Sequence, residues 1–247
     1  MEQVQEIKTS ARRNTPACLA VIAFLGALPL IWGQNAIEVA PQNYRLTFDN
    51  RDFRVIRVIY RPHEHVALHS HPATPTLYVY LTDSGPVRFS HEEEHAFSLI
   101  RPPEKAGTFR FSPGRLEKHT VDNLGDIDSQ FLRVELKTLP LGYGGNSVRG
   151  PKTFDAVHSG LRREFESDRL EIDRIVAAPQ AAVTVPHASG DALLIALADT
   201  SIESDAGGDA RLLKLGEVFC PDPARDYRIR SQHSSTVGHM LRVLIKP

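Results

Sequence analysis

The chain has 247 residues, which is long enough for two compact domains of ordinary size. Its 29 Lys and Arg residues nearly balance its 30 Asp and Glu residues, and no long run of one sign stands out. This balance argues against binding to nucleic acid or to an anionic lipid surface. The eleven His residues are unusually many, and they matter for function only where several of them converge.

Residues 1–36 differ in composition from the rest of the chain. Three basic residues precede an apolar run over residues 17–33, which is the layout of a secretory signal peptide. An uncleaved membrane anchor is one alternative, although the run is shorter than the ~20 apolar residues that cross a bilayer comfortably. An apolar tail without a targeting role is another. We therefore expect an exported protein, periplasmic or secreted, or a membrane-anchored one if the segment is not cleaved.

The chain has two cysteines, and Cys18 lies in this N-terminal segment. Cleavage of a signal peptide would leave Cys220 as a single thiol, so no disulfide could form within the mature chain. The fold must then be stabilised by its hydrophobic cores.

After residue 40 the sequence has the pattern of a β protein. Short runs rich in Val, Ile, Leu, Phe and Tyr are separated by clusters of Pro, Gly, Asp and Asn, which is typical of a β-sandwich or barrel. The clearest of these runs cover residues 53–62, 77–90, 108–114 and 131–137.

A stretch that is poor in core residues and rich in Gly and Pro separates two similar halves. Placing His71 on His187, 116 positions later, also superposes Ile56 on Ile172 and several other apolar residues. The closing strands agree as well, FLRVELK against MLRVLIK. The sequence thus predicts an all-β protein with two jelly-roll barrels, preceded by a signal or anchor helix. The predicted boundaries are residues 37–138 for the first barrel, 139–160 for the linker and 161–247 for the second barrel.

Two histidines on one predicted strand are the strongest candidates for a site. His69 and His71 are separated by one residue, and alternate residues of a strand share a face. A divalent transition metal needs several neutral imidazoles or carboxylates at about 2 Å. A third imidazole must come from a distant strand, and His119 follows a Gly- and Pro-containing turn that would return the chain to the barrel.

These residues resemble the motifs of the cupin superfamily. The second cupin motif has Gly, five intervening residues, Pro-x-Gly, two residues, His, three residues and Asn. In this chain Gly107, Pro113, His119 and Asn123 match it, with one extra residue between Pro113 and His119 and with Arg115 in the position of the second Gly. The resemblance implies a metal-binding β-barrel, with His119 as a ligand.

The first cupin motif is matched only in part. It contains His-x-His followed by a Glu ligand, and His69 and His71 match the pair, but Thr76 stands in the Glu position. The resemblance covers residues 45–137 well and residues 161–247 in outline. It implies three His ligands for Fe, Mn, Ni, Cu or Zn, with coordination positions left open.

A site without a carboxylate ligand keeps a higher net charge on the metal, which favours small anionic substrates. Some cupin dioxygenases use three His in this way, so the resemblance permits a dioxygenase-type enzyme. Strand alternation places Thr76, Tyr78 and Tyr80 on one face, where they would line a substrate pocket. Arg57 and Arg133 also lie on predicted strands, and the sequence leaves open whether either of them points inward to hold an anion.

A surface cluster of histidines is the alternative to a metal site. His63 and His65 precede the His-x-His pair in a polar stretch. The flanking strands argue against a mere surface cluster, and so does the sequence separation between His71 and His119, which is long enough for several strands. We expect His63 and His65 to lie at the rim or in solvent.

Residues 91–95 read His-Glu-Glu-Glu-His, which matches the H-E-x-x-H pattern of zinc proteases. That pattern binds zinc only on a helix, where positions i and i+4 face one ion. The neighbouring sequences instead predict two strands. We therefore place residues 91–95 on an exposed hairpin turn.

The second half lacks the histidine pattern. Val185 and His187 replace the His-x-His pair, and no His aligns with His119. We expect a second barrel without a metal, which would serve as a structural partner, a dimerisation surface or an apolar ligand pocket. His233 and His239 are predicted to be surface residues.

The sequence therefore predicts an exported metalloprotein, and an enzyme of the three-His dioxygenase type is the leading hypothesis. Its partners would be a small-molecule substrate, a membrane if the N-terminus tethers it, and a second copy if either barrel dimerises. A non-catalytic envelope protein that binds a metal or a small ligand is the alternative. The fold does not decide between them, because the same fold hosts both.

Overall fold

The structure is a computed structural model of the chain. The predicted signal or anchor segment lies outside the described residues, except for residues 35 and 36. The structure describes residues 35–92, 95–153, 157–207, 209–232 and 235–247.

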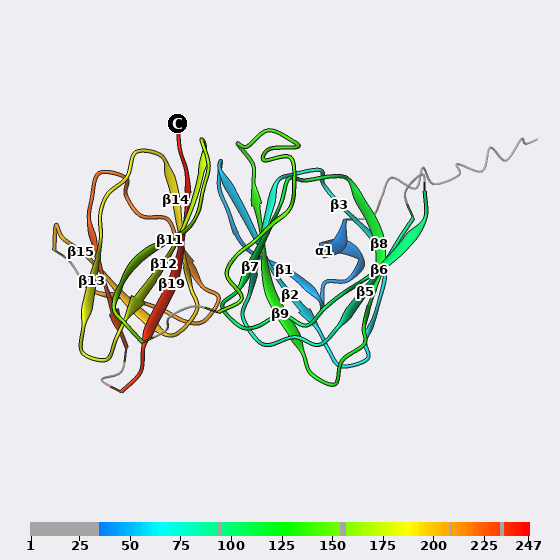
Figure 1. Ribbon diagram of the computed structural model, residues 1–247, viewed down its shortest axis with the longest axis horizontal. Coiled ribbons are helices and arrows are strands. Elements are labelled where there is room, and N and C mark those ends of the chain that lie inside the picture. Colours follow the sequence, from blue (N-terminus) through cyan, green and yellow to red (C-terminus); the bar gives the residue numbers. More distant parts are fainter. Residues whose placement is uncertain (1–34, 93–94, 154–156, 208, 233–234) are drawn as a thin grey trace, which may run out of the picture. The chain divides into compact units, whose positions relative to one another are not determined.

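Within these residues the chain forms one short helix and 19 strands (Figure 1). The prediction of an all-β protein is confirmed. The first elements are α1 (Ala36–Val39), β1 (Tyr44–Asp49), β2 (Phe53–Tyr60), β3 (His65–His71), β4 (Thr76–Tyr80), β5 (Val87–His91), β6 (Phe97–Arg101), β7 (Phe109–Ser112), β8 (Glu117–Asn123), β9 (Ser129–Leu136) and β10 (Val148–Arg149). The remaining strands are β11 (Gly160–Glu166), β12 (Leu170–Ala177), β13 (Ala182–Val185), β14 (Asp191–Ala196), β15 (Thr200–Ser204), β16 (Arg211–Leu213), β17 (Val218–Phe219), β18 (Tyr227–Ser231) and β19 (Gly238–Ile245).

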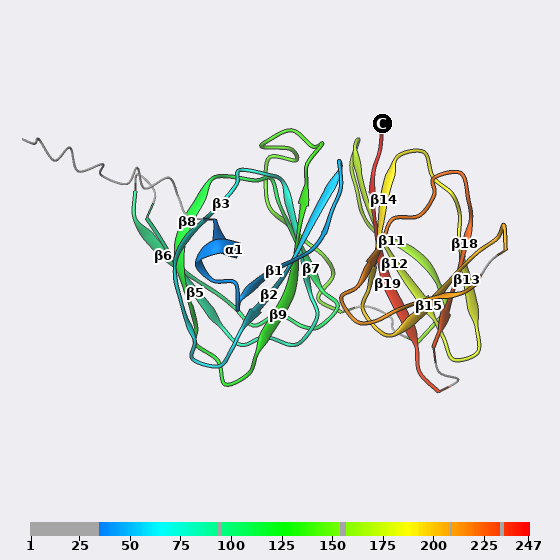
Figure 2. The ribbon, with the colours of Figure 1, turned by 180° about the vertical axis from the view of Figure 1, so that it is seen from behind.

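The two halves of the chain have the same topology. The first half forms a sheet of order β1-β2-β9-β4-β7-β10 and a second sheet of order β3-β8-β5-β6. The second half forms β11-β12-β19-β14-β17 and β13-β18-β15-β16, so each strand from β1 to β9 has a counterpart ten numbers later (Figure 2). Among the described residues of the second half, strand β10 has no counterpart. It lies in the predicted linker and pairs with β7.

The sequence alignment of the halves is wrong by one residue on the first matched strand. Ile56 lies in the core inside the first barrel, whereas Ile172 lies in the core shared by both halves. Val55 lies in that same shared core, and Phe53 and Leu170 each begin their strand. Because a slip of one residue moves a side chain to the other face, Val55 is the counterpart of Ile172.

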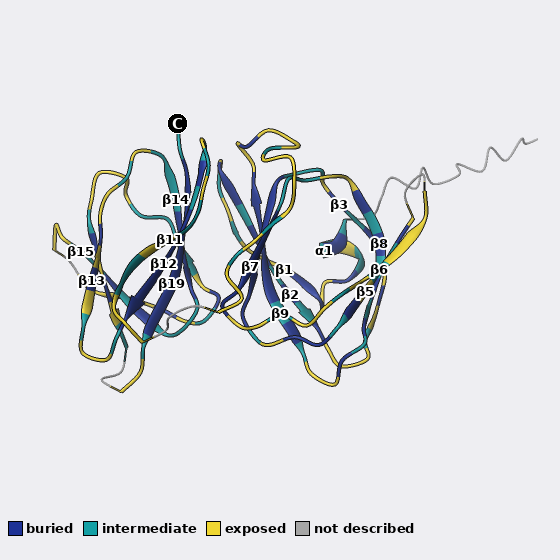
Figure 3. Ribbon diagram, in the orientation of Figure 1, coloured by how far each residue is buried: buried dark blue, intermediate teal, exposed yellow. Residues whose placement is uncertain are grey.

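Three buried clusters stabilise the fold. One fills the first barrel, one fills the second, and the largest joins the six-stranded sheet to the five-stranded sheet. Burial follows the strands of these sheets, whereas the edge strand β6 is largely exposed (Figure 3).

The N-terminal end of the described chain is part of the first barrel. The Asn35 side chain accepts a hydrogen bond from the backbone N–H of Ile37 and caps α1, and Asn35 also bridges to Ser70 of β3. Ala36 is almost fully buried in the core of the barrel. Residues 35 and 36 thus belong structurally to the barrel. The helix α1 is short, and no helix among the described residues is long and apolar enough to cross a membrane.

Asn123 ties the end of β8 to two neighbouring loops. Its side-chain amide group donates to the backbone oxygens of Tyr60, Arg61 and Ile127, and its side-chain oxygen accepts from the N–H of Gly125. Asn123 is 1% exposed. The Asn of the second cupin motif therefore has a structural role here, because it anchors the strand that carries His119.

We predict that Asn123→Ala lowers the free energy of unfolding by about 2–4 kcal/mol, because it leaves several buried polar groups unpaired. Urea unfolding measures this change. Asn146→Ala, at an exposed loop position, is the control and should change it by less than about 0.5 kcal/mol. Equal effects of the two variants would contradict the anchoring role.

His239 is buried, so the prediction that it lies on the surface is wrong. The Arg174 guanidinium donates to its Nε2 over 2.6 Å and also donates to the backbone oxygen of Gly107 in the first half of the chain. Burial and the positive charge of Arg174 lower the pKa of His239 to about 3. His233 lies outside the described residues.

A folded-state pKa of about 3, below the unfolded value of about 6.5, means that acid stabilises the unfolded chain. His239 therefore contributes stability above pH 6.5, and this contribution is lost as the pH falls. We predict that the stability advantage of the wild type over His239→Gln shrinks by about 2 kcal/mol between pH 7 and pH 5. Urea unfolding at several pH values measures it, and parallel pH profiles would contradict it.

Candidate metal centre

Three adjacent strands bring four histidines together. Strand β8 lies between β3 and β5, and His119 is directly opposite His69 on one side and His91 on the other. His71 shares the buried face of β3 with His69. The alternation of β3 and β8 therefore turns these imidazoles into the barrel.

The three predicted ligands form one cluster. His69, His71 and His119 each offer a nitrogen, and these atoms lie within 4.8 Å of one another. The ring centroids are 4.8 to 5.3 Å apart. All three side chains are buried. The histidines named from the sequence thus meet at one point inside the first barrel.

Hydrogen bonds fix the orientation of His69. Its Nδ1 lies 2.7 Å from the backbone oxygen of Ala67, which can only accept, so Nδ1 carries the hydrogen. Its Nε2 then presents a lone pair, and the Tyr44 hydroxyl lies 2.8 Å from it. The Tyr60 hydroxyl lies 2.7 Å from that of Tyr44, which makes a buried chain of polar groups. A metal-binding imidazole is commonly oriented by such a bond at its other nitrogen.

His119 has two buried ring nitrogens without a hydrogen-bond partner among the described residues. Burial lowers the pKa of His119 to about 3, with Glu117 opposing this and the nearby His69, His91 and Arg133 adding to it. Burial also lowers the pKa of His71 and of His69. The three imidazoles are therefore neutral at pH 7, which is the form that binds metals. Because an unpaired buried nitrogen is costly, the orphaned atoms of His119 fit a metal ion.

The Glu position of the first cupin motif contributes no ligand here. The Thr76 hydroxyl donates to the backbone oxygen of Thr74, and Thr76 does not line the cavity beside the histidines. Glu117 lies on the same face of β8 as His119, two residues away, and does line the cavity. It is not one of the clustered ligand groups. The sequence interpretation missed Glu117, although strand alternation back from His119 could have identified it.

His91 was also missed, because it belongs to the His-Glu-Glu-Glu-His stretch. The antiparallel strands β5 and β6 flank that stretch, and its described residues form no helix. The prediction that residues 91–95 form an exposed hairpin turn is wrong for His91, which ends β5. His91 itself is buried, stacks on Phe97 and lies with its ring centroid 5.0 Å from that of His119. The sequence feature that could have identified His91 is its position at the end of a predicted strand. In the structure that strand places it opposite His119.

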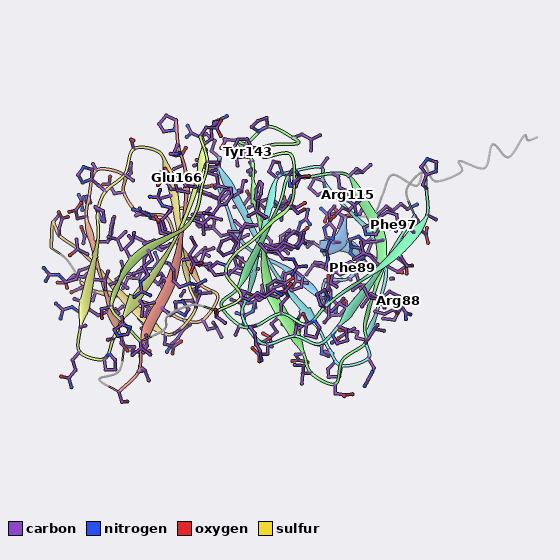
Figure 4. All side chains as sticks on the ribbon, in the orientation of Figure 1. Arg88, Phe89, Phe97, Arg115, Tyr143 and Glu166 are labelled. Carbon is purple, nitrogen blue, oxygen red and sulfur yellow. The ribbon has the colours of Figure 1, made fainter. Side chains whose placement is uncertain are left out.

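The cavity beside His71 and His119 is small, with about 30 Å³ of free space, enough for about one water molecule. Tyr78 and Tyr80 line it, and their role as substrate-pocket residues stays a prediction. Phe89 of β5 points into the barrel and lies against His119, with ring centroids 5.2 Å apart (Figure 4).

Of the two arginines that the sequence left open, Arg133 points into this cavity and Arg57 does not. The Arg57 guanidinium reaches the backbone oxygen of Leu215, whereas Arg133 is buried and pairs with Glu135 at 3.1 Å and with Glu117 at 3.4 Å. Burial acts to lower the pKa of Arg133, but Tyr78 and these two carboxylates raise it overall. The same pairing lowers the pKa of Glu117 against the opposing effect of burial, so Glu117 stays ionised.

The other sequence histidines lie away from the centre. His63 and His65 are exposed and pair with Asp126 and Asp122, as expected for rim residues. His187 of the second half is exposed and pairs with Asp226. In the described part of the second half there is no cluster of potential metal ligands.

Comparison of the sequence with models of protein families and with curated proteins finds no match. Solved structures do match. Oxalate decarboxylase from Bacillus subtilis has a TM-score of 0.55 at 11% identity, covering 79% of this chain and 68% of that one. YhaK from Escherichia coli has a TM-score of 0.54 at 10% identity, covering 83% and 92%. YlbA from E. coli has a TM-score of 0.54 at 14% identity, covering 83% of each chain.

At such low identity the likeness shows the fold alone. It agrees with the repeated two-sheet topology of the chain. The resemblance inferred from the His-x-His pair and the second motif is therefore confirmed at the level of the fold, and the chain has the fold of the cupin superfamily.

Proposed function

We propose that the first barrel binds a divalent transition metal through His69, His71 and His119. The observation that carries this proposal is the pair of buried, unpartnered nitrogens of His119 within a cluster of three neutral imidazoles. Fe, Mn, Ni, Cu and Zn all accept such ligands. The B. subtilis oxalate decarboxylase has Mn(II) centres.

A bound metal would supply Lewis-acid activation of an oxygen donor, because three protein ligands leave coordination positions open. The residues around it favour an anionic ligand. Three arginines and one glutamate line the cavity, and Glu135 pairs with one of the arginines, so one positive charge is left over before the metal is counted. We therefore propose a non-haem metalloenzyme of the dioxygenase type that acts on a small anionic molecule.

The second candidate is an envelope protein that binds a metal or a small ligand without catalysis. The small free space beside the histidines favours it, because little more than a metal and one small oxygen donor fits there without movement. Export through the N-terminal segment is a proposal that rests on the sequence. The second barrel, with its intact topology and no described ligand cluster, would be a structural partner in either case.

We predict that His71→Ala and His119→Ala reduce the metal content of the purified protein from about one ion per chain to nearly none, because two imidazoles hold a divalent ion poorly. Elemental analysis by mass spectrometry measures it. His65→Ala, at an exposed position on the same strand as His71, is the matched control and should keep the metal. Full metal content in both site variants would contradict the three-His assignment.

Oxygen consumption separates the enzyme from the binder. For the enzyme we expect metal-dependent oxygen uptake with at least one enolisable or phenolic acid in the wild type, and none in His119→Ala. Absence of uptake with any of the five reconstituted metals would favour the binder.

A further inference from the structure

Two arginines lie at the junction between the histidine cavity and a wider outer pocket. Arg101 of β6 and Arg110 of β7, together with Glu117, line both spaces. The outer pocket has about 370 Å³ of free space, which is enough for a small organic molecule. A ligand that reaches the histidines from this pocket must therefore pass these two guanidinium groups.

Arg110 is buried without a full set of partners. It is 6% exposed, and its Nε has no hydrogen-bond partner among the described residues. Its guanidinium carbon lies 4.0 Å from the centre of the Tyr78 ring, and it also stands beside the Tyr80 hydroxyl, whose pKa burial raises and Arg110 lowers. No carboxylate forms an ion pair with it among the described residues.

The neighbouring arginine of the same row, Arg133, has two carboxylate partners. Arg110, Tyr78 and Arg133 lie directly opposite one another on β7, β4 and β9, so Tyr78 separates two guanidinium groups. Arg133 forms ion pairs with Glu135 and Glu117, whereas Arg110 forms none among the described residues and acts on Glu117 from a longer distance. The contrast within one row shows that the unmatched charge is a property of Arg110.

Arg101 adds a second unmatched group. Its Nε is buried without a partner among the described residues, and its guanidinium carbon lies 5.2 Å from the centre of the Phe89 ring. Burial lowers the pKa of Arg101, and the positive charge of Arg110 lowers it further. Burying two like charges is unfavourable unless a counter-charge binds between or beside them.

The other arginines of the outer pocket already have partners. Arg115 lies 3.6 Å from a Glu117 oxygen and contacts His91, and Arg149 pairs with Glu104. They are partly exposed, and they add positive potential at the entrance.

We propose that Arg101 and Arg110 form an oxyanion subsite that holds one end of the ligand whose other end reaches the three-His centre. The ligand class is a small organic acid with an oxygen donor at each end, such as a short dicarboxylate. Guanidinium groups fit carboxylates and phosphates alike, so the experiment compares both. The metal-binding end rests on the proposed function, whereas the arginine subsite stands on its own residues.

Binding to metal-free protein tests the subsite by itself. Malonate and inorganic phosphate are titrated calorimetrically into chelator-treated wild type, Arg110→Gln, Arg101→Gln and the control Arg88→Gln. Arg88 lies next to Phe89 on β5 but on the outer side of the barrel (Figure 4). We expect malonate to bind the wild type and Arg88→Gln equally, and about 10- to 100-fold more weakly in the two subsite variants.

Other outcomes of this titration overturn specific parts of the proposal. No binding of either probe to the wild type, or equal binding to wild type and Arg110→Gln, overturns the subsite. Tighter binding of phosphate than of malonate overturns the carboxylate assignment. Restoring the metal should tighten malonate more than propionate, which has one carboxylate. If the protein binds no metal, the three-His proposal fails while the metal-free titration still decides on the arginines.

Thermal stability without ligand distinguishes a binding role from a structural one. If Arg110 is an unmatched charge held for a ligand, Arg110→Met should raise the melting temperature of the metal-free protein by about 2–4 °C, because an apolar side chain is easier to bury. Saturating malonate should remove or reverse this advantage, because only the wild type gains from binding. A melting temperature lower than that of the wild type without ligand would indicate a structural arginine and contradict the proposal.

Discussion

The pairing of β3 with β8 is the constraint on which the rest of the structure depends. It sets His69 directly opposite His119, and the alternation of β3 adds His71 on the same face. Burial then keeps all three imidazoles neutral. Burying the two unpaired nitrogens of His119 is unfavourable unless a metal ion or another ligand binds them. Asn123, at the end of β8, holds this strand to two loops, so the fold and the centre share one support.

Paired charges lie on one side of the histidine cluster, and an excess of positive charge lies on the other. Arg133 and its two carboxylates form a satisfied network on one side, and Arg101 and Arg110 leave positive charge on the other. A buried polar group without a partner is costly, and a bound ligand is one way to satisfy it. Metal and arginines would therefore select the same kind of ligand, a small acid, from opposite ends.

The sequence alone predicted the parts of this site that a regular period reveals. His69 and His71 follow the two-residue period of a strand. His119 was identified from the Gly- and Pro-containing turn before it and from the second cupin motif. Glu117 lies two residues before His119 on the same strand face, but its stretch was interpreted as the turn that precedes His119. His91 ends a strand, but its stretch was interpreted as an exposed hairpin turn. Tyr44 could not be found, because its contact with His69 depends on how β1 approaches β3 in space. The one-residue error between Ile56 and Ile172 arose because apolar residues occur on both faces of these strands.

The duplicated topology separates the fold from the centre. The second half keeps the same strand order, and β13 and β18, the counterparts of β3 and β8, carry the apolar core residues Val183, Val185 and Ile229. Coordination by three imidazoles in the first barrel is the central proposal. X-ray absorption spectroscopy of the metal-loaded protein tests it most directly. We predict three imidazole ligands at about 2.0–2.2 Å, reduced to two in His119→Ala. A first shell without imidazole, or one unchanged in that variant, would contradict it.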